Sequence, residues 1–215
     1  MVYKNKSNNR YCHNYIMKYG FDIFYKSIIK LDWFQSLTTL YLNNNHIGNK
    51  GVEFIAIYKP RFLKNLYLCS NDIDKDGAKS IANELIYKSK FLICLHLNDN
   101  NISDDGANYI IESSCINKSL IDLYLDNNNI SSMGIKSIIN LLKFNKNLYS
   151  LYLNDNDINE IQKEFIYILL NNNKINKKNL KKEHKVSKIY ILEAFPLLKK
   201  PWQFEFLEFF DSIEF

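Results

Sequence analysis

Five stretches of this chain repeat one eleven-residue pattern, and no other feature of the sequence limits the fold as strongly. Each stretch reads L-x-x-L-x-L-x-x-N-x-I, and successive copies begin 26, 29, 28 and 28 residues apart. Repeats with a period of about 20–50 residues form units that stack on their neighbours. We therefore predict a solenoid over residues 37–170. The repeats begin at Leu37, Leu63, Leu92, Leu120 and Leu148.

Each repeat is predicted to contain a strand followed by a helix. Successive side chains of a strand point to opposite faces, so Leu123 and Leu125 point one way and Tyr124 the other. Downstream, apolar residues recur every three or four positions, as on one face of a helix. Stacking such units places a parallel sheet on the inner, concave face and helices on the outer face. The predicted fold class is α/β, a curved solenoid of about five repeats with helical caps.

The repeats resemble those of leucine-rich-repeat proteins. Besides the shared pattern, four copies place a glycine four residues after the final isoleucine, where the fifth copy has Gln162. The long period and the helix after the glycine resemble the ribonuclease-inhibitor-like subclass, which includes the repeat regions of Ran GTPase activators and NOD-like receptors. The resemblance covers residues 37–170. The glycines are Gly51, Gly77, Gly106 and Gly134.

One asparagine is present at the same position of every repeat, where the chain leaves the strand. Backbone groups lose their ladder partners at this point, and a carboxamide can both donate and accept hydrogen bonds. We interpret these residues as a structural ladder between adjacent coils, and removal of one is expected to cost about 1–3 kcal/mol. The ladder consists of Asn45, Asn71, Asn100, Asn128 and Asn156.

A row of aromatic side chains is predicted on the exposed face of the strands, one per strand and about 4.8 Å apart. Four positions of each repeat, within the strand and just after it, are predicted to be exposed. Aligned across the repeats, these positions form four rows, which hold aspartates but no Lys or Arg. Tyrosine is enriched at binding hot spots, so the row is a candidate partner-binding surface; it is also a good strand former, and stacked rings stabilise neighbouring strands. The row is Tyr41, Tyr67, His96, Tyr124 and Tyr152, with Asp99, Asp122, Asp126 and Asp155 beside it.

The ends of the chain lack the repeat. Residues 1–36 are rich in aromatic and aliphatic side chains and are predicted to form a helical cap over the first repeat. Residues 171–215 begin with a basic stretch, interpreted as a linker, and end in an aromatic and acidic segment, residues 202–215. That segment is expected to cap the solenoid or, alternatively, to dock on a partner.

Charge and motifs exclude several function classes. The net charge of +5 belongs to the ends, because residues 37–158 hold 12 Lys and Arg against 13 Asp and Glu. This distribution does not favour a nucleic-acid-binding surface. The sequence has no phosphate loop, no HExxH motif and no zinc-ligand spacing. We therefore expect no enzymatic activity, no metal and no cofactor.

The cysteines and the hydropathy of the sequence indicate the cellular compartment of the protein. The sequence has no apolar run of about 18 residues and its N-terminal stretch is polar, so neither a spanning helix nor a secretory signal is expected. The cysteines have no metal-binding spacing and are expected to be free thiols in a reducing compartment. Cytoplasmic localisation is predicted, with the nucleus also compatible. The cysteines are Cys12, Cys69, Cys94 and Cys115.

Together these features predict a non-enzymatic module for protein–protein interaction that binds its partner on the tyrosine-lined concave face. The partner is expected to carry a basic or apolar segment, by complementarity with the acidic rows. Resemblance to Ran GTPase activators gives one alternative, a regulator of a small GTPase. The other alternative is the recognition subunit of a larger receptor or ubiquitin-ligase assembly.

Overall fold

The computed structural model describes residue 26 and residues 29–179 of the chain. The chain divides into two compact units, Met1–Lys174 and Ile175–Phe215. Of the second unit, the structure describes only the last part of one helix, up to Asn179. The predicted N-terminal cap up to residue 25 and the aromatic segment 202–215 lie outside the described residues.

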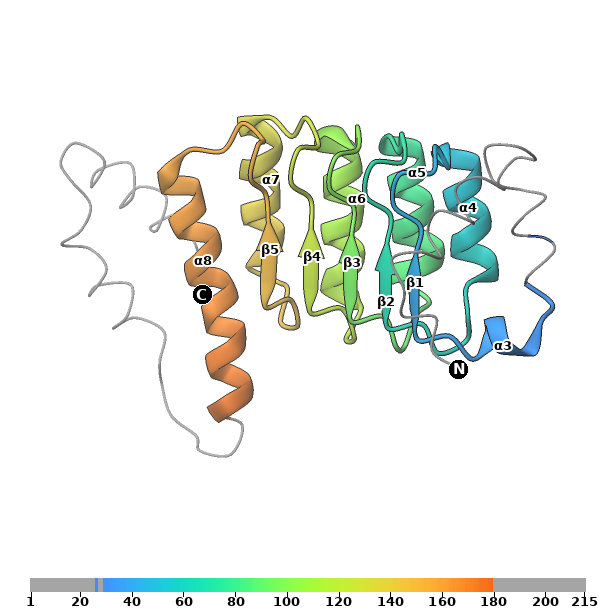
Figure 1. Ribbon diagram of the computed structural model, residues 1–215. Helices are drawn as coiled ribbons and strands as arrows, with labels where there is room; N and C mark the ends of the chain where they lie inside the picture. Colours follow the sequence, from blue (N-terminus) through green and yellow to red (C-terminus); the bar gives the residue numbers. More distant parts are fainter. Residues whose placement is uncertain (1–25, 27–28, 180–215) are drawn as a thin grey trace, which may run out of the picture. The chain divides into compact units, whose positions relative to one another are not determined.

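Strands and helices alternate through the described part of the chain (Figure 1). The predicted boundary at residue 170 falls inside the last helix. Within the second repeat, a short α-helix continues directly into one π-helical segment. The elements are α3 (Asp32–Gln35), β1 (Thr39–Tyr41), α4 (Gly48–Tyr58), β2 (Asn65–Tyr67), α5 (Lys75–Ser80), η1 (Ile81–Ile86), β3 (Cys94–His96), α6 (Ser103–Ile116), β4 (Asp122–Tyr124), α7 (Ser132–Leu142), β5 (Ser150–Tyr152) and α8 (Glu160–Asn179).

The five strands form one parallel sheet in the order β1-β2-β3-β4-β5, and each strand pairs with the next repeat in register. The helices α4 to α7 form a layer against one face of this sheet (Figure 1). The opposite face, made by the exposed strand positions and called the sheet face below, carries no helix layer among the described residues. The predicted α/β solenoid is therefore confirmed.

The core lies between the strands and the helices. The leucine at the centre of each inner strand is fully buried, as Leu66, Leu95 and Leu123 show. The apolar residues of the helices meet these leucines, and each fully buried aliphatic side chain contributes about 1.5–3 kcal/mol relative to exposure. The equivalent residue of the last strand, Leu151, is only half-buried. The core therefore remains partly open beside β5.

The repeated glycines permit close approach of neighbouring coils. A Cβ atom on Gly106 would lie 2.7 Å from Ile102 Cγ2, 2.9 Å from Ala78 Cβ and 3.1 Å from the Lys75 Cα atom. The start of α6 therefore packs against the start of α5 at a distance that leaves no room for a side chain. This explains why the repeat keeps glycine at this position.

Four of the five ladder asparagines connect adjacent coils through both ends of their side chains. The first, Asn45, donates only within its own coil, to the Leu42 and Asn43 carbonyls, and its buried Oδ1 has no partner among the described residues. Asn100 Oδ1 accepts hydrogen bonds from the amides of Asn71 and Ile73, each at 3.0 Å. Its Nδ2 donates to the carbonyls of Leu68 at 3.1 Å and Leu97 at 2.9 Å. One carboxamide thus supplies partners to two coils at the point where the sheet ends. Asn71, Asn128 and Asn156 make the corresponding bonds.

A second set of asparagines, which lies outside the eleven-residue pattern, holds the opposite end of the coils. Asn117 Oδ1 accepts from the amides of Ser119 and Leu120, each at 2.8 Å. Its Nδ2 donates to the Ile86 carbonyl at 2.7 Å. Asn145 holds the equivalent turn one repeat later. The signal was present in the sequence, because both residues lie three positions before the start of a repeat.

Candidate functional site

The aromatic row on the sheet face forms one continuous stack. The ring centroids of Tyr41 and Tyr67 are 4.4 Å apart, and those of Tyr67 and His96 are 4.3 Å apart. The His96 and Tyr124 centroids lie 3.9 Å apart, and those of Tyr124 and Tyr152 lie 4.3 Å apart. The interplanar angles are between 7° and 19°, so the rings face one another. In-register pairing of the strands brings all five predicted residues together.

Stacking decides which parts of the rings a partner can reach. The terminal rings, Tyr41 and Tyr152, are 45% and 40% exposed, whereas the three inner rings are half-buried. Each inner ring has both of its faces covered by its neighbours. The stack therefore presents ring edges and hydroxyl groups along its length, and only its two end rings have a face on which no described ring stacks.

The stack also changes the titration of its members. Burial, followed by interaction with the Tyr152 hydroxyl, raises the pKa of Tyr124 to about 12. Burial, followed by the charge of Tyr41, also raises the pKa of Tyr67. Burial lowers the pKa of His96, and the nearby Asp122 and Asp126 carboxylates oppose this effect. At neutral pH the surface therefore offers neutral phenol hydroxyls and a neutral imidazole.

The four predicted aspartates do not have the same surroundings. Asp126 Oδ1 accepts from the Asn154 amide at 2.7 Å, and Asp99 Oδ1 accepts from Asn127 Nδ2 at 3.0 Å. Both carboxylates therefore help to connect coils. Asp122 and Asp155 make no side-chain hydrogen bond to another described residue. These two carboxylates are the ones available to a partner.

Backbone geometry explains why acidic and amide residues occupy the position that follows the strands. The five residues at this position have φ between 50° and 58°. This left-handed conformation is costly for most residues but is tolerated by Asn and Asp. The presence of Asp99 and Asp155 therefore has a structural reason that is independent of binding. The five are Asn44, Ser70, Asp99, Asn127 and Asp155.

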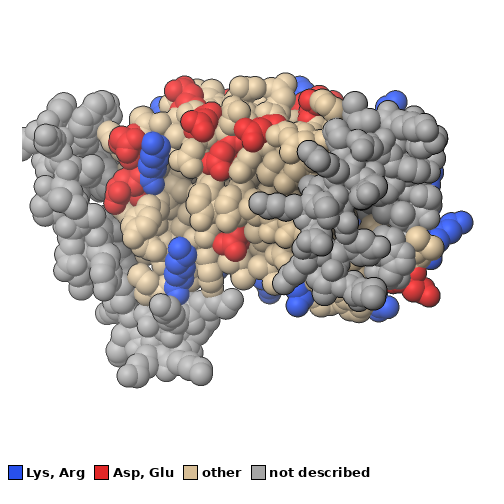
Figure 2. Space-filling model, viewed as in Figure 1, with Lys and Arg blue, Asp and Glu red and all other residues tan. Residues whose placement is uncertain are grey.

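The sheet face carries mainly acidic side chains over the strands. In Figure 2, the Asp and Glu side chains on this face lie over the strand region, mainly toward the ends at which the strands finish, and also at the α8 end. The Lys and Arg side chains on the same face lie at the α8 end and along the margins. The strand positions themselves hold no cationic residue. The distribution favours a partner with positive charge over the strands.

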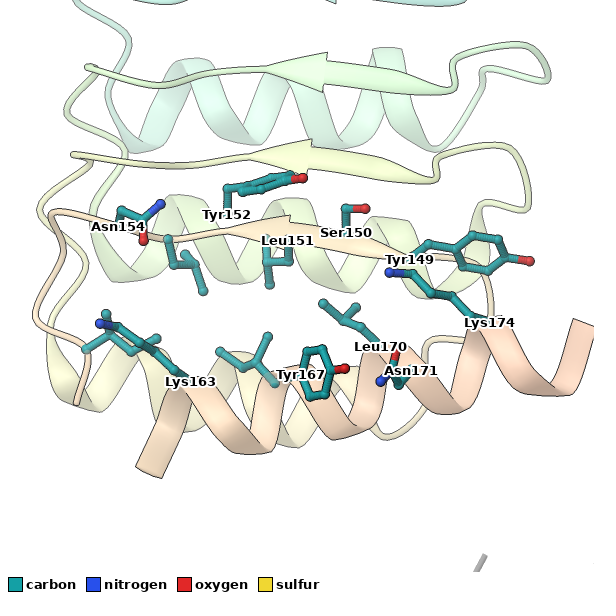
Figure 3. A pocket seen from close by; sticks show the side chains of 13 residues that line it. Tyr149, Ser150, Leu151, Tyr152, Asn154, Lys163, Tyr167, Leu170, Asn171 and Lys174 are labelled. Carbon is teal, nitrogen blue, oxygen red and sulfur yellow. The ribbon is translucent and has the colours of Figure 1, made fainter. Parts of the chain in front are cut away.

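A groove lies beside the last strand, between β5 and α8, and is called the β5–α8 groove below (Figure 3). Its volume is about 240 Å³. Leu151 and Leu170 contribute apolar surface, and Tyr152 connects the groove with the aromatic stack. Lys163 and Lys174 lie toward its two ends (Figure 3). This groove was not predictable from the sequence, because the helical packing that forms it is not part of the repeat.

The described residues show no arrangement typical of a metal site or a reactive nucleophile. Within this part of the chain, no group of three or more His, Cys, Asp or Glu side chains is placed to hold a metal ion. Cys69, Cys94 and Cys115 are free thiols. Burial, followed by the charge of Asp122, raises the pKa of Cys94 to about 11, so its thiol stays protonated at neutral pH. No helix in the region the structure describes combines the length and hydropathy needed to cross a membrane.

Comparison with known proteins places the repeat in a family. The family described as Leucine Rich repeat matches residues 35–56, 59–82 and 88–110. No curated protein matches the sequence. The period and the strand–helix composition of the repeats are compatible with the ribonuclease-inhibitor-like subclass.

Two solved structures have a similar fold. The leiomodin-1 actin-binding site 2 aligns with a TM-score of 0.65 and 22% identity, over 75% of this chain and 93% of that one. The tropomodulin C-terminal domain of Caenorhabditis elegans aligns with a TM-score of 0.60 and 14% identity, over 80% of this chain and 98% of that one. The family match over the first three repeats and the in-register parallel sheet through all five together identify the chain as a leucine-rich-repeat protein.

Proposed function

We propose that this protein is a non-enzymatic interaction module that binds a protein partner on its sheet face, through the aromatic stack and the carboxylates beside it. The supporting observation is the combination of an accessible row of ring edges and hydroxyls with Asp122, on a face whose strand positions lack Lys and Arg. Tyr41, Tyr67, His96, Tyr124 and Tyr152 are the proposed contact residues.

The chemistry of the row specifies the kind of partner. Ring edges carry partial positive charge, and phenol hydroxyls both donate and accept hydrogen bonds. The Asp122 and Asp155 carboxylates add negative charge at the margins of the row. A segment that combines a Lys or Arg with apolar side chains would satisfy both features, because its cation meets the carboxylates while its apolar atoms cover the rings.

The test is capture of partners from a native extract with the full chain as bait. Asp122→Ser removes the free carboxylate and leaves the residue that the fifth repeat carries at the same position, Ser150. Glu112→Ser removes one negative charge from the exposed side of α6 and is the matched control. We expect at least about five-fold weaker capture with the first variant and unchanged capture with the second. Equal recovery of the same proteins with both would show that the sheet face is not the binding surface.

The leiomodin-1 domain supplies one named partner for a direct test, since that domain is named as an actin-binding site. The similarity between the two chains is one of fold. Co-sedimentation of the full chain with actin filaments, with the Asp122→Ser and Glu112→Ser variants in parallel, determines whether actin is a ligand of the sheet face. The GTPase-regulator alternative predicts faster GTP hydrolysis in a panel of small GTPases, and the receptor or ligase alternative predicts capture of a larger assembly.

A further inference from the structure

The sheet is unfinished at β5. In the inner coils, the amide of the leucine after each aromatic residue donates to the carbonyl of the next aromatic, as from Leu97 to Tyr124 and from Leu125 to Tyr152, both at 2.9 Å. The corresponding amide of the last coil belongs to Leu153, and it has no acceptor among the described residues. The Asp155 amide also has no acceptor among the described residues. The equivalent amide of the previous coil, that of Asn127, donates to the Asn154 carbonyl at 2.9 Å.

The aromatic stack is open at the same place. Tyr124 covers one face of the Tyr152 ring. No described ring stacks on the other face, which borders the β5–α8 groove. Tyr167 extends from α8 on the far side of the groove (Figure 3). The groove volume of about 240 Å³ exceeds the roughly 150 Å³ cavity that holds a benzene molecule, so one aromatic side chain fits.

The floor of the groove is apolar. Leu151 is half-buried, although its counterparts in the four other strands are buried. Ile166 and Leu170 of α8 lie beside it among the lining residues. A strand that continued the sheet would point alternate side chains toward this floor and toward the aromatic row. It would therefore bury apolar surface on one face and stack a ring on the other.

The ends of the groove are cationic. Lys163 forms an exposed ion pair with Glu160 at 2.7 Å, which offsets its charge. Lys174 is exposed and forms no ion pair within the described part of the chain. Opposite charge in a ligand would therefore be favoured near Lys174, in contrast to the acidic surface over the inner strands.

We propose that the β5–α8 groove binds an extended segment of a partner protein, which pairs with β5 as a sixth strand. The segment has an apolar–aromatic–apolar centre and at least one acidic residue near an end. Its backbone accepts hydrogen bonds from the Leu153 and Asp155 amides, its ring stacks on Tyr152, and its carboxylate faces Lys174. Strand addition of this kind derives its affinity from main-chain bonds and its specificity from side-chain pockets.

This site is separate from the proposed sheet-face site apart from Tyr152, because Asp122 does not line the groove. A test on Lys174 therefore fails or succeeds independently of the Asp122 test above. Loss of peptide binding in the Lys174 variant with unchanged capture in the Asp122 variant would support the groove site and reject the sheet-face site. Unchanged peptide binding in the Lys174 variant with loss of capture in the Asp122 variant would support the sheet-face site and reject the groove site.

The probe is a fluorescein-labelled peptide with a Leu-Tyr-Leu centre flanked by glutamates, titrated against the full chain by fluorescence anisotropy. Lys174→Glu is expected to weaken binding by at least about five-fold. Lys136→Glu, the same charge reversal at an exposed position of α7, is expected to leave binding unchanged and serves as the matched control. A thermal unfolding curve of each variant verifies that both are folded.

Two peptide variants test the binding mode. N-methylation of the backbone on both sides of the tyrosine prevents strand pairing and should abolish binding, while replacement of the tyrosine by serine should weaken it by at least about five-fold. Equal binding of the N-methylated peptide, or equal effects of the two lysine variants, overturns the proposal.

Two other occupants give distinct outcomes. Tighter peptide binding by a full-length variant with serines at Phe206, Phe209 and Phe210 would assign the groove to the chain's own aromatic segment. A dimer that Lys174→Glu dissociates would assign it to a second copy of the chain. Either result replaces the proposed partner segment.

Discussion

The imidazole of His96 lies 3.9 Å from the Tyr124 ring, centroid to centroid, and the two planes differ by 11°. Tyr67 covers the opposite face of the same imidazole at 4.3 Å. The only histidine of the aromatic row is therefore enclosed between two phenol rings at the centre of the stack, where burial disfavours its charged form.

Acidification is expected to destabilise the fold through His96. Its pKa in the folded chain is below the ordinary value of 6.5, chiefly because of burial. The unfolded chain then binds the proton more readily, so the His96 contribution to stability is present above about pH 6.5 and is lost as the pH falls through the folded pKa. Urea unfolding at about pH 7.5 and about pH 5.5 measures the change. His96→Tyr, which matches the other repeats, should show a smaller loss; the same loss in both would contradict this assignment.

Removal of an inner ring should cost more stability than removal of a terminal ring. Tyr124 stacks on two neighbours and Tyr41 on one. With about 0.5–1.5 kcal/mol per aromatic pair, Tyr124→Ala should lower the free energy of unfolding by about 1–3 kcal/mol and Tyr41→Ala by about half as much. Urea unfolding of both variants at one pH provides the comparison. Equal losses would show that stacking does not stabilise the sheet.

The asparagine ladder predicts a sharp contrast between two adjacent residues. Asn128 is fully buried, and its Nδ2 donates to the Leu97 carbonyl at 2.9 Å. Asn128→Ala should cost about 1–3 kcal/mol, because the Ile102 amide loses its acceptor and the Leu97 carbonyl keeps only the donor from Asn100. Asn127→Gly keeps the left-handed backbone at φ 50° and removes an exposed hydrogen bond, so its cost should stay below about 1 kcal/mol. Thermal unfolding measures the stability of both variants, and equal losses of stability would contradict the structural role of the asparagine ladder.

Close approach of the coils makes Gly106 sensitive to a single methyl group. Gly106→Ala places a Cβ at 2.7 Å from Ile102 Cγ2 and at 3.1 Å from backbone, so α6 must shift, and a cost of about 1–3 kcal/mol is expected. Gly48→Asn is the matched control. Gly48 has φ +60°, and a Cβ atom added to it would meet nothing within 4 Å, a setting that asparagine tolerates. A melting temperature of Gly106→Ala equal to that of the wild type would disprove the packing argument.

The repeat pattern predicted much of the fold because each position has one physical requirement. The alternation of Leu123, Tyr124 and Leu125 determines which residues enter the core, and this holds in the structure. In-register pairing then follows because every repeat begins with the same pattern, and it brings the five aromatic residues into one row. The pattern therefore predicted the strands, the helices and the members of the row.

Other properties of the candidate site depend on geometry that no repeat pattern encodes. The sequence alone does not distinguish Asp99, Asp122 and Asp126. In the structure, Asp126 accepts a hydrogen bond from a backbone amide and Asp99 occupies a left-handed turn, whereas Asp122 has neither role. The half-burial of Leu151 depends on where α8 lies, because β5 is the last strand of the sheet and has no further repeat packed against it. The β5–α8 groove follows from that break in symmetry and was not predictable from the repeat.

The spacing of the rings has a consequence for the shape of any partner. Parallel strands are about 4.8 Å apart, and coils related by pure translation would hold their rings at that same distance. The observed centroid distances of 3.9 to 4.4 Å are shorter, so successive coils must tilt toward one another on the ring side. On a sheet face that curves in this way, a flat partner surface would contact the two ends of the row before its centre. The stack is reached best by a narrow convex element, such as a single helix or a protruding loop.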